Sequence, residues 1–272
     1  MTIIIAEIGW NHMGDMDIAR KMIQSAKDSG ADYAKFQTWH VENLTGGSWD
    51  EDGRREIYTK AELTNDKHFQ LKKMCEEIGI KFLTSVFNPS DVEFIASICD
   101  DIKVPSTEMD NLELIKSIIS HFKNKETHHI FLSTGTSLWG DVEKVVKLLQ
   151  ENGMSFSVMH CVSSYPCPFE ICNLDRINSI KELHNNIGYS GHCEGIFDAI
   201  VSLEYDINVI EKHFTIDHEL PGRDNKFAIL PHELKYLCDL RDSRNSLKKH
   251  LGNDYIENET DCRNNYKRRW CK

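Results

Sequence analysis

Hydrophobic and polar positions follow two alternating patterns along nearly the whole chain. Short apolar runs are each followed by a longer amphipathic segment, which favours parallel βα units over a sandwich or a helical bundle. The predicted strands cover residues 2–6, 33–37, 81–85, 101–104, 129–133, 155–160, 186–190 and 207–213. Eight strands in 272 residues predict an α/β fold of one domain, the (β/α)₈ or TIM barrel, which takes about 250 residues.

The amphipathic segments predict helices around this barrel. They cover residues 17–28, 67–77, 89–97, 111–121, 138–151 and 231–247, with Gly30, Gly79 and Gly153 placed to end helices. Residues 39–60 interrupt the rhythm, and we expect a loop of this length on the active face to cover a substrate. Residues 1–250 are therefore assigned to the catalytic barrel and 251–272 to a linker-like tail.

Composition and charge argue against several classes of protein. The net charge of −11 disfavours nonspecific nucleic-acid binding, which needs clustered Lys and Arg such as the single run at 267–269. The nine cysteines are scattered without a CxxC pair, which predicts reduced thiols rather than a disulfide framework or a structural zinc site. With no signal segment and no apolar run near 18 residues, we expect a cytoplasmic protein without a membrane partner.

Two histidines close apolar runs near the end of the predicted barrel. His192 ends the segment GYSGH (188–192), and His213 lies in EKHF (211–214). A lone histidine at a strand end is more often a hydrogen-bonded structural residue, by roughly three to one. Because both would emerge at the same end of the sheet, we interpret the pair as ligands of one metal ion.

The other predicted strands also end in polar residues, which is where a barrel places its catalytic groups. Two lysines, Lys35 and Lys103, with nearby hydroxyls form a set suited to a phosphate group. The alternatives are salt-bridged lysines and hydroxyls that cap helices. Carboxylates for proton transfer or sugar hydroxyls are available at Glu7, Glu108, Glu211 and Asp224, and no nucleophilic triad is evident.

The ordered motifs resemble those of the sialic acid synthases, the N-acetylneuraminate synthase-like family. They are EIGWNHMG (7–14), KFQ (35–37), STG (133–135), HC with YP (160–166), GYSGH (188–192), EKHF (211–214) and PGRD (221–224). The match runs from about residue 3 to about residue 250, and as an ordered set it is specific. The resemblance implies a transferase that condenses phosphoenolpyruvate with an N-acetylated amino sugar such as N-acetylmannosamine. The products would be a nine-carbon 2-keto acid and phosphate.

The resemblance also implies a role for each matching residue. The metal ligands would be His192 and His213, binding Mn²⁺ with Mg²⁺ or Co²⁺ as alternatives, and the catalytic carboxylates would be Glu7 and Glu211. The phosphoenolpyruvate pocket would comprise Lys35, Thr84, Lys103, Ser106, Ser133, Ser163 and Ser190. The sugar site would comprise Gln37, Glu108, Tyr165 and Asp224. A homodimer is also expected from the resemblance.

Three departures from the family pattern concern the site. Ser163 stands where the family often has Asn, Gly191 where it usually has Asp, and Arg223-Asp224-Asn225 where Pro-Asp-His is usual. Typical members also continue into a C-terminal antifreeze-like domain of about 60 residues, whereas this sequence stops at the linker. Two alternatives therefore stay open: a synthase for another acceptor, either a diacetamido sugar or a sugar phosphate, and a noncatalytic sugar-binding barrel.

Overall fold

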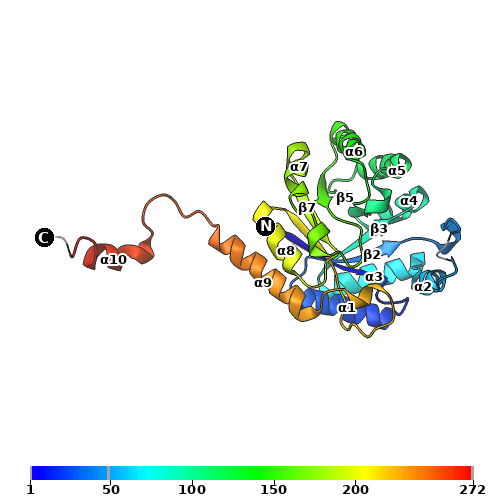
Figure 1. The fold of residues 1–272 in the computed structure, drawn as a ribbon, viewed down its shortest axis with the longest axis horizontal. Coiled ribbons are helices and arrows are strands. Elements are labelled where there is room, and N and C mark those ends of the chain that lie inside the picture. The colour runs from blue at the N-terminus through cyan, green and yellow to red at the C-terminus, as the bar shows by residue number, and fades with distance from the viewer. Residues whose placement is uncertain (1, 48–49, 271–272) are drawn as a thin grey trace.

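The strands of this protein close into a parallel barrel. The computed structural model describes residues 2–47 and 50–270. Within them, neighbouring strands pair in chain order and β8 returns to pair with β1. Figure 1 shows the strands with helices around them. The strands are β1 (Ile3–Gly9), β2 (Tyr33–Thr38), β3 (Lys81–Val86), β4 (Asp101–Val104), β5 (His129–Ser133), β6 (Phe156–His160), β7 (Ile187–Gly191) and β8 (Val209–His213). The predicted single-domain TIM barrel is confirmed.

Most of the helices follow the strands and cover the outside of the barrel. The α-helices are α1 (Met16–Asp28), α2 (Arg54–Ala61), α3 (Asn65–Ile78), α4 (Val92–Ile98), α5 (Leu112–Phe122), α6 (Trp139–Glu151), α7 (Arg176–Leu183), α8 (Phe197–Ser202), α9 (Pro231–Leu247) and α10 (Thr260–Asn265). Short 3₁₀ helices lie at Val41–Asn43, Pro89–Asp91, Ser106–Glu108, Phe169–Ile171, Leu203–Tyr205, Asp224–Lys226 and Glu257–Glu259.

The largest difference from the predicted elements is in residues 39–60. The prediction of one long loop is wrong there, because the segment contains a 3₁₀ turn and most of α2. The α2 sequence RREIYTKA has no clear apolar stripe, so pattern alone does not reveal it. Tertiary packing supports the helix instead, since Tyr58 stacks on Trp10 with ring centroids 4.8 Å apart. The predicted role of this segment in covering a substrate stays a prediction.

Two apolar layers determine which side chains reach the site. A large core fills the space between strands and helices, and a smaller one fills the barrel interior. Six strands each contribute one side chain to the interior layer, namely Ile5, Tyr33, Leu83, Phe131, Met159 and Val209. Because side chains alternate along a strand, the residue two positions further on also faces the interior. The next interior layer, toward the carboxyl ends of the strands, therefore consists of the residues two positions after these six.

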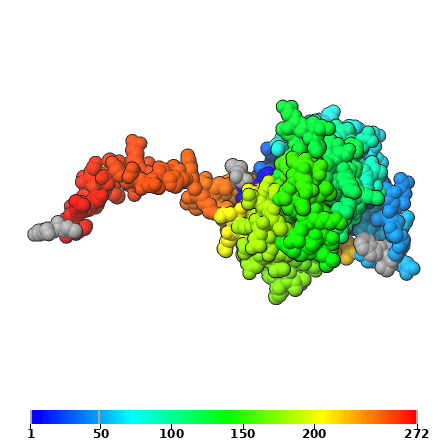
Figure 2. Space-filling model, turned by 90° about the horizontal axis from the view of Figure 1, so that it is seen from above, coloured from blue at the N-terminus to red at the C-terminus, as the bar shows by residue number. Residues whose placement is uncertain are grey.

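The C-terminal segment leaves the barrel after α9. Figures 1 and 2 show it extending away from the strands toward α10, and residues 249–270 are exposed. Across the part of the chain that the structure describes, no helix has the length and apolar character needed to cross a membrane. The cysteines in these residues are free thiols, as predicted, whereas Cys271 lies outside the described residues.

Candidate active site

A polar layer lies directly above the apolar interior layer, at the carboxyl ends of the strands. Moving two residues along six strands leads from the apolar positions to Glu7, Lys35, Ser85, Ser133, Cys161 and Glu211. All six are nearly inaccessible to solvent. A barrel that buries charged side chains at this depth needs partners for them, so the contacts within the layer indicate its chemistry.

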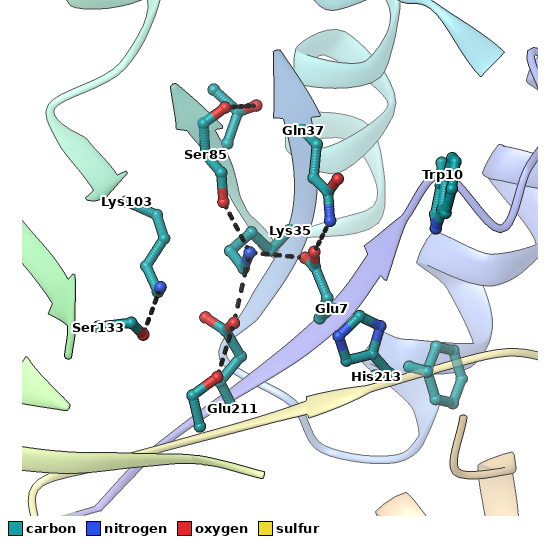
Figure 3. Close-up of polar contacts among 12 residues, drawn as sticks. Glu7, Trp10, Lys35, Gln37, Ser85, Lys103, Ser133, Glu211 and His213 are labelled. Atoms are coloured by element: carbon teal, nitrogen blue, oxygen red, sulfur yellow. Dashed lines mark hydrogen bonds and ion pairs between the residues drawn. The ribbon is translucent and has the colours of Figure 1, made fainter. Parts of the chain in front are cut away.

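Lys35 is the centre of the first group of contacts, which Figure 3 shows. Its Nζ lies 2.9 Å from Glu7 Oε2 and 3.4 Å from Glu211 Oε1, and it donates to Ser85 Oγ at 2.9 Å. Gln37 Nε2 donates to Glu7 Oε1 at 2.6 Å, which holds that carboxylate from the other side. The charge of Lys35 is thus already balanced by two carboxylates from β1 and β8.

Lys103 has a different environment from Lys35. Its Nζ donates to Ser133 Oγ at 2.6 Å and to the carbonyl of Val104 at 3.2 Å. Among the described residues, no carboxylate lies within ion-pair distance of this ammonium, which is 2% exposed. Burial lowers the pKa of Lys103, because an ammonium without a close counter-ion is poorly solvated there. The arrangement is suited to an anion supplied from outside the chain.

The two carboxylates differ in the protonation state that their surroundings favour. Burial raises the pKa of Glu7 from 4.5 to about 7, and the attraction of Lys35 offsets only part of this effect. Burial also acts to raise the pKa of Glu211, but Lys103 and Lys35 together outweigh it and hold the value below its usual range. Glu7 can therefore exchange a proton near neutral pH while Glu211 stays ionised, a division of roles typical of acid–base sites.

We expect Glu7→Gln to reveal this raised pKa as a pH-dependent gain in stability. A raised acid pKa stabilises the folded state at low pH, and that contribution is lost as pH rises from about 4.5 to about 7. The neutral variant should match the parent near pH 5 and exceed it near pH 8 by up to about 3 kcal/mol. Urea unfolding at both pH values measures this difference. A constant difference between the proteins would contradict the raised pKa.

The histidine pair lies beside this layer, at the ends of β7 and β8. The rings of His192 and His213 have centroids 5.4 Å apart. His192 Nδ1 lies 2.6 Å from the carbonyl of Val162, which leaves its Nε2 toward the site and matches the way metal-bound histidines are oriented. Burial lowers the pKa of His192 to about 4 and that of His213 well below 6.5, so both rings are neutral.

These two rings fit the requirements of a metal site with open positions. Neutral imidazole is the ligand form, and His213 Nδ1 is buried without a hydrogen bond within the described chain. No group of three or more His, Cys, Asp or Glu side chains in the described residues is arranged to hold an ion. A divalent cation bound here would therefore need water or substrate oxygens to complete its coordination.

The predicted sugar-binding residues divide into two groups. Tyr165 lies against His192 with ring centroids 4.2 Å apart, and Asp224 Oδ2 is 3.4 Å from His213 Nδ1. Burial raises the pKa of Asp224 to about 6. Glu108, by contrast, accepts from Asn111 Nδ2 at 2.9 Å on its own 3₁₀ turn. Within the described residues, its hydrogen bond does not join it to the lysines or histidines.

The structure does not bring Thr84 to the site. Its hydroxyl lies 2.8 Å from Thr38 Oγ1, and Thr38 in turn contacts His68 Nε2 of α3 at 2.8 Å. Thr84 therefore faces the helices outside the barrel wall. The inward residue of β3 is Ser85, which contacts Lys35. Thr84, predicted for the phosphoenolpyruvate pocket, thus does not reach the interior layer that contains Lys35, whereas Ser85 does, because a one-residue step along a strand reverses the face.

The remaining predicted hydroxyls lie on the interior side. Ser190 Oγ donates to Glu211 Oε1 at 3.2 Å, and the hydroxyls of Ser106 and Ser163 are 2.8 Å apart. A Cβ at Gly135 would overlap Ser163 Oγ and stand 2.8 Å from Cys161 Sγ, so only glycine fits between these loops. The contact between Ser106 and Ser163 thus joins the loop after β4 to the loop after β6. Ser163 stands at the position where the family often has Asn.

Trp10 is a site residue that the sequence reasoning missed. Its Nε1 donates to Asp224 Oδ2 at 2.5 Å, across 214 positions of sequence, so no local signal was available. Asn225 is buried, donating to the carbonyls of Asn11 and Pro221. Asn11 in turn donates to the carbonyl of Phe214 at 2.9 Å. These amides brace the loops that carry Trp10 and Asp224.

Proteins with a similar sequence or structure indicate the family of this chain. Residues 22–254 match the model of the NeuB family. The chain is 34% identical over 253 residues to N,N'-diacetyllegionaminic acid synthase of Campylobacter jejuni, covering 87% of this chain and 74% of that protein. It is 31% identical over 250 residues to N-acetylneuraminate-9-phosphate synthase of Drosophila melanogaster, covering 86% and 65% respectively. The crystal structure of N-acetylneuraminic acid synthetase from Leptospira borgpetersenii in complex with citrate has a TM-score of 0.86 at 28% identity, covering 98% of this chain and 93% of that chain. This chain belongs to the NeuB family of sugar acid synthases.

Proposed function

We propose that the protein condenses phosphoenolpyruvate with an N-acetylated amino sugar of the N-acetylmannosamine type, giving a nine-carbon 2-keto acid and phosphate. The observation that carries the proposal is Lys103, a buried cation whose contacts are a hydroxyl and a carbonyl. An ammonium in this position is stabilised by a bound anion, and phosphoenolpyruvate supplies a phosphate and a carboxylate. Ser133 accepts from Lys103, so its own hydroxyl proton can donate to the same anion.

The proposed reaction forms a carbon–carbon bond before phosphate leaves. C3 of phosphoenolpyruvate attacks the aldehyde carbon of the open-chain sugar, and water adds to C2. The C2–O bond to the phosphate then breaks, leaving the 2-keto acid and inorganic phosphate. Lys103 stabilises the charge on the departing phosphate, and Glu7 can hold or release a proton near neutral pH.

His192 and His213 are the proposed ligands of a divalent ion, Mn²⁺ first, with Mg²⁺ and Co²⁺ as alternatives. When bound, the ion would supply Lewis-acid polarisation of the sugar aldehyde oxygen. Tyr165 and Asp224 flank the two rings, so the acceptor sugar would lie over this side of the site. Gln37 and Glu108 remain proposed acceptor contacts, and a homodimer remains a prediction.

We expect phosphate release from phosphoenolpyruvate to require both an amino sugar and His213. The intact chain is assayed with Mn²⁺ and a panel of N-acetylmannosamine, diacetamido sugars and sugar phosphates. Replacing His213 with Ala removes one of two protein ligands and should reduce the rate by about 10²-fold or more. Thr84→Val is the matched control, because its hydroxyl lies outside the barrel interior, and it should keep its activity.

The acceptor panel separates the proposal from its alternatives. Turnover only with a diacetamido sugar or a sugar phosphate would keep the chemistry and change the substrate, in line with Arg223 at the position of the usual proline. Sugar binding in calorimetry without turnover by folded, metal-saturated protein would favour the noncatalytic barrel. Sugar-independent phosphate release would be incompatible with a synthase.

A further inference from the structure

A buried ion pair lies immediately behind the histidine pair, on the outer face of the barrel wall. Lys212 stands between Glu211 and His213 on β8, so its side chain points away from the interior. Its Nζ donates to both carboxylate oxygens of Asp198, at 3.0 and 2.9 Å. Both residues are buried. Neither was predicted from the sequence, and the proposed chemistry uses neither.

The same ammonium also holds the backbone next to His192. Lys212 Nζ donates at 2.7 Å to the carbonyl of Cys193, the residue that follows His192 directly. The carbonyl of His192 itself accepts from Cys167 N at 2.9 Å. Lys212, which adjoins His213 on β8, is therefore hydrogen-bonded to the backbone carbonyl of the residue that follows His192. This link spans the two elements that set the distance between the rings.

Asp198 is positioned by a buried hydroxyl on the outer face of β7. Its Oδ2 accepts from the Tyr189 hydroxyl at 2.8 Å, and its helix α8 follows the loop that carries His192. A Cβ at Gly191 would overlap Asp198 Oδ2 and stand 3.0 Å from Lys212 Cδ. Lys212 and Asp198 thus pack directly on the backbone that precedes His192. At position 191 the family pattern usually has an aspartate, whereas this chain has glycine.

We infer that Lys212 and Asp198 are positioning residues that fix the separation and orientation of the His192 and His213 rings for a divalent cation. The carboxylate from α8 takes the space beside Gly191 and holds the Lys212 ammonium against the Cys193 carbonyl. A buried charge pair costs desolvation, and that cost is offset here by four hydrogen bonds to the two side chains. The inference rests on the proposed metal site and concerns its preorganisation.

Metal binding by the purified full chain tests the inference without any turnover. Electron paramagnetic resonance of free Mn²⁺ gives the affinity, and the visible spectrum of bound Co²⁺ reports the ligand geometry. We expect Lys212→Met to weaken Mn²⁺ binding by about 10- to 100-fold and to change the Co²⁺ spectrum. This variant also leaves Asp198 buried without its cation, which destabilises the fold. Weaker Mn²⁺ binding could then arise from lower stability of the protein instead of from misplaced histidine rings, and the two causes have to be separated.

The double variant Lys212→Met/Asp198→Asn makes that separation. It removes both charges, so the melting temperature should recover toward that of the parent. The donor to the Cys193 carbonyl is still missing, and the Mn²⁺ affinity should stay low. Arg241→Met is the control, because the buried Arg241 forms an ion pair with the partly exposed Asp32 at 2.7 Å, between α9 and the residue before β2. It should lower the melting temperature and leave Mn²⁺ binding unchanged.

Each result bears on the inference in a defined way. Parent-like Mn²⁺ affinity in the double variant would overturn it, as would an equal loss of affinity in Arg241→Met. Failure of the parent chain itself to bind Mn²⁺ or Co²⁺ would remove the proposed metal site and this inference with it. Normal metal binding without phosphate release would contradict the proposed function and leave the positioning role standing.

Discussion

Lys103→Met should lower kcat/KM for phosphoenolpyruvate by about 10²- to 10³-fold, which corresponds to about 3–4 kcal/mol of lost transition-state stabilisation. The physical reason is that Lys103 is a buried ammonium whose charge is left for the substrate anion. Methionine keeps much of the volume and removes the charge. The measurement is initial-rate phosphate release over a range of phosphoenolpyruvate concentrations at saturating sugar.

The same substitution should not destabilise the fold. Burial lowers the pKa of Lys103, so the protein interior solvates its ammonium less well than water does. An apolar side chain of similar length avoids this desolvation, which offsets the lost attraction between Lys103 and Glu211, so the free energy of unfolding should change little. A variant that loses activity together with several kcal/mol of stability would contradict this view of Lys103.

Lys35→Met is expected to have the opposite effect on stability, although Lys35 lies in the same layer. Its Nζ is 2.9 Å from Glu7 Oε2 and 3.4 Å from Glu211 Oε1. Removing this cation leaves two buried carboxylates facing each other, which costs about 3–5 kcal/mol when one partner of a buried ion pair is lost. Urea unfolding at pH 8 should show this loss, and activity should fall with it.

The pH dependence of the Lys35→Met variant provides its control. Without the ammonium, protonation of Glu7 relieves the repulsion, so part of the lost stability should return near pH 5. Lys35→Met combined with Glu7→Gln should recover stability at pH 8 for the same reason. A stability loss that is the same at both pH values would indicate a packing defect instead.

The sequence by itself determined the barrel and the neighbourhood of the site. Apolar runs alternating with amphipathic segments predict the strand order, because this periodicity is a local property of the chain. Ser133 and His213 end their strands, Lys103 is the last residue but one of β4, and parallel strands bring their carboxyl ends together, so the convergence of these residues follows from the fold class. The motif order then identified the family.

The tertiary structure decided which side of each strand reaches the interior. Both faces of a barrel strand are buried, so β3 shows no hydrophobic alternation that distinguishes Thr84 from Ser85. Contacts between residues far apart in the sequence could not be predicted from local pattern either. Examples are the hydrogen bonds of Trp10 with Asp224 and of Lys212 with the Cys193 carbonyl. The unequal pKa values of Glu7 and Glu211 also arise only there, since burial and the placement of two lysines set them. Local pattern thus determined the strands, and packing determined α2 and the chemistry of the site.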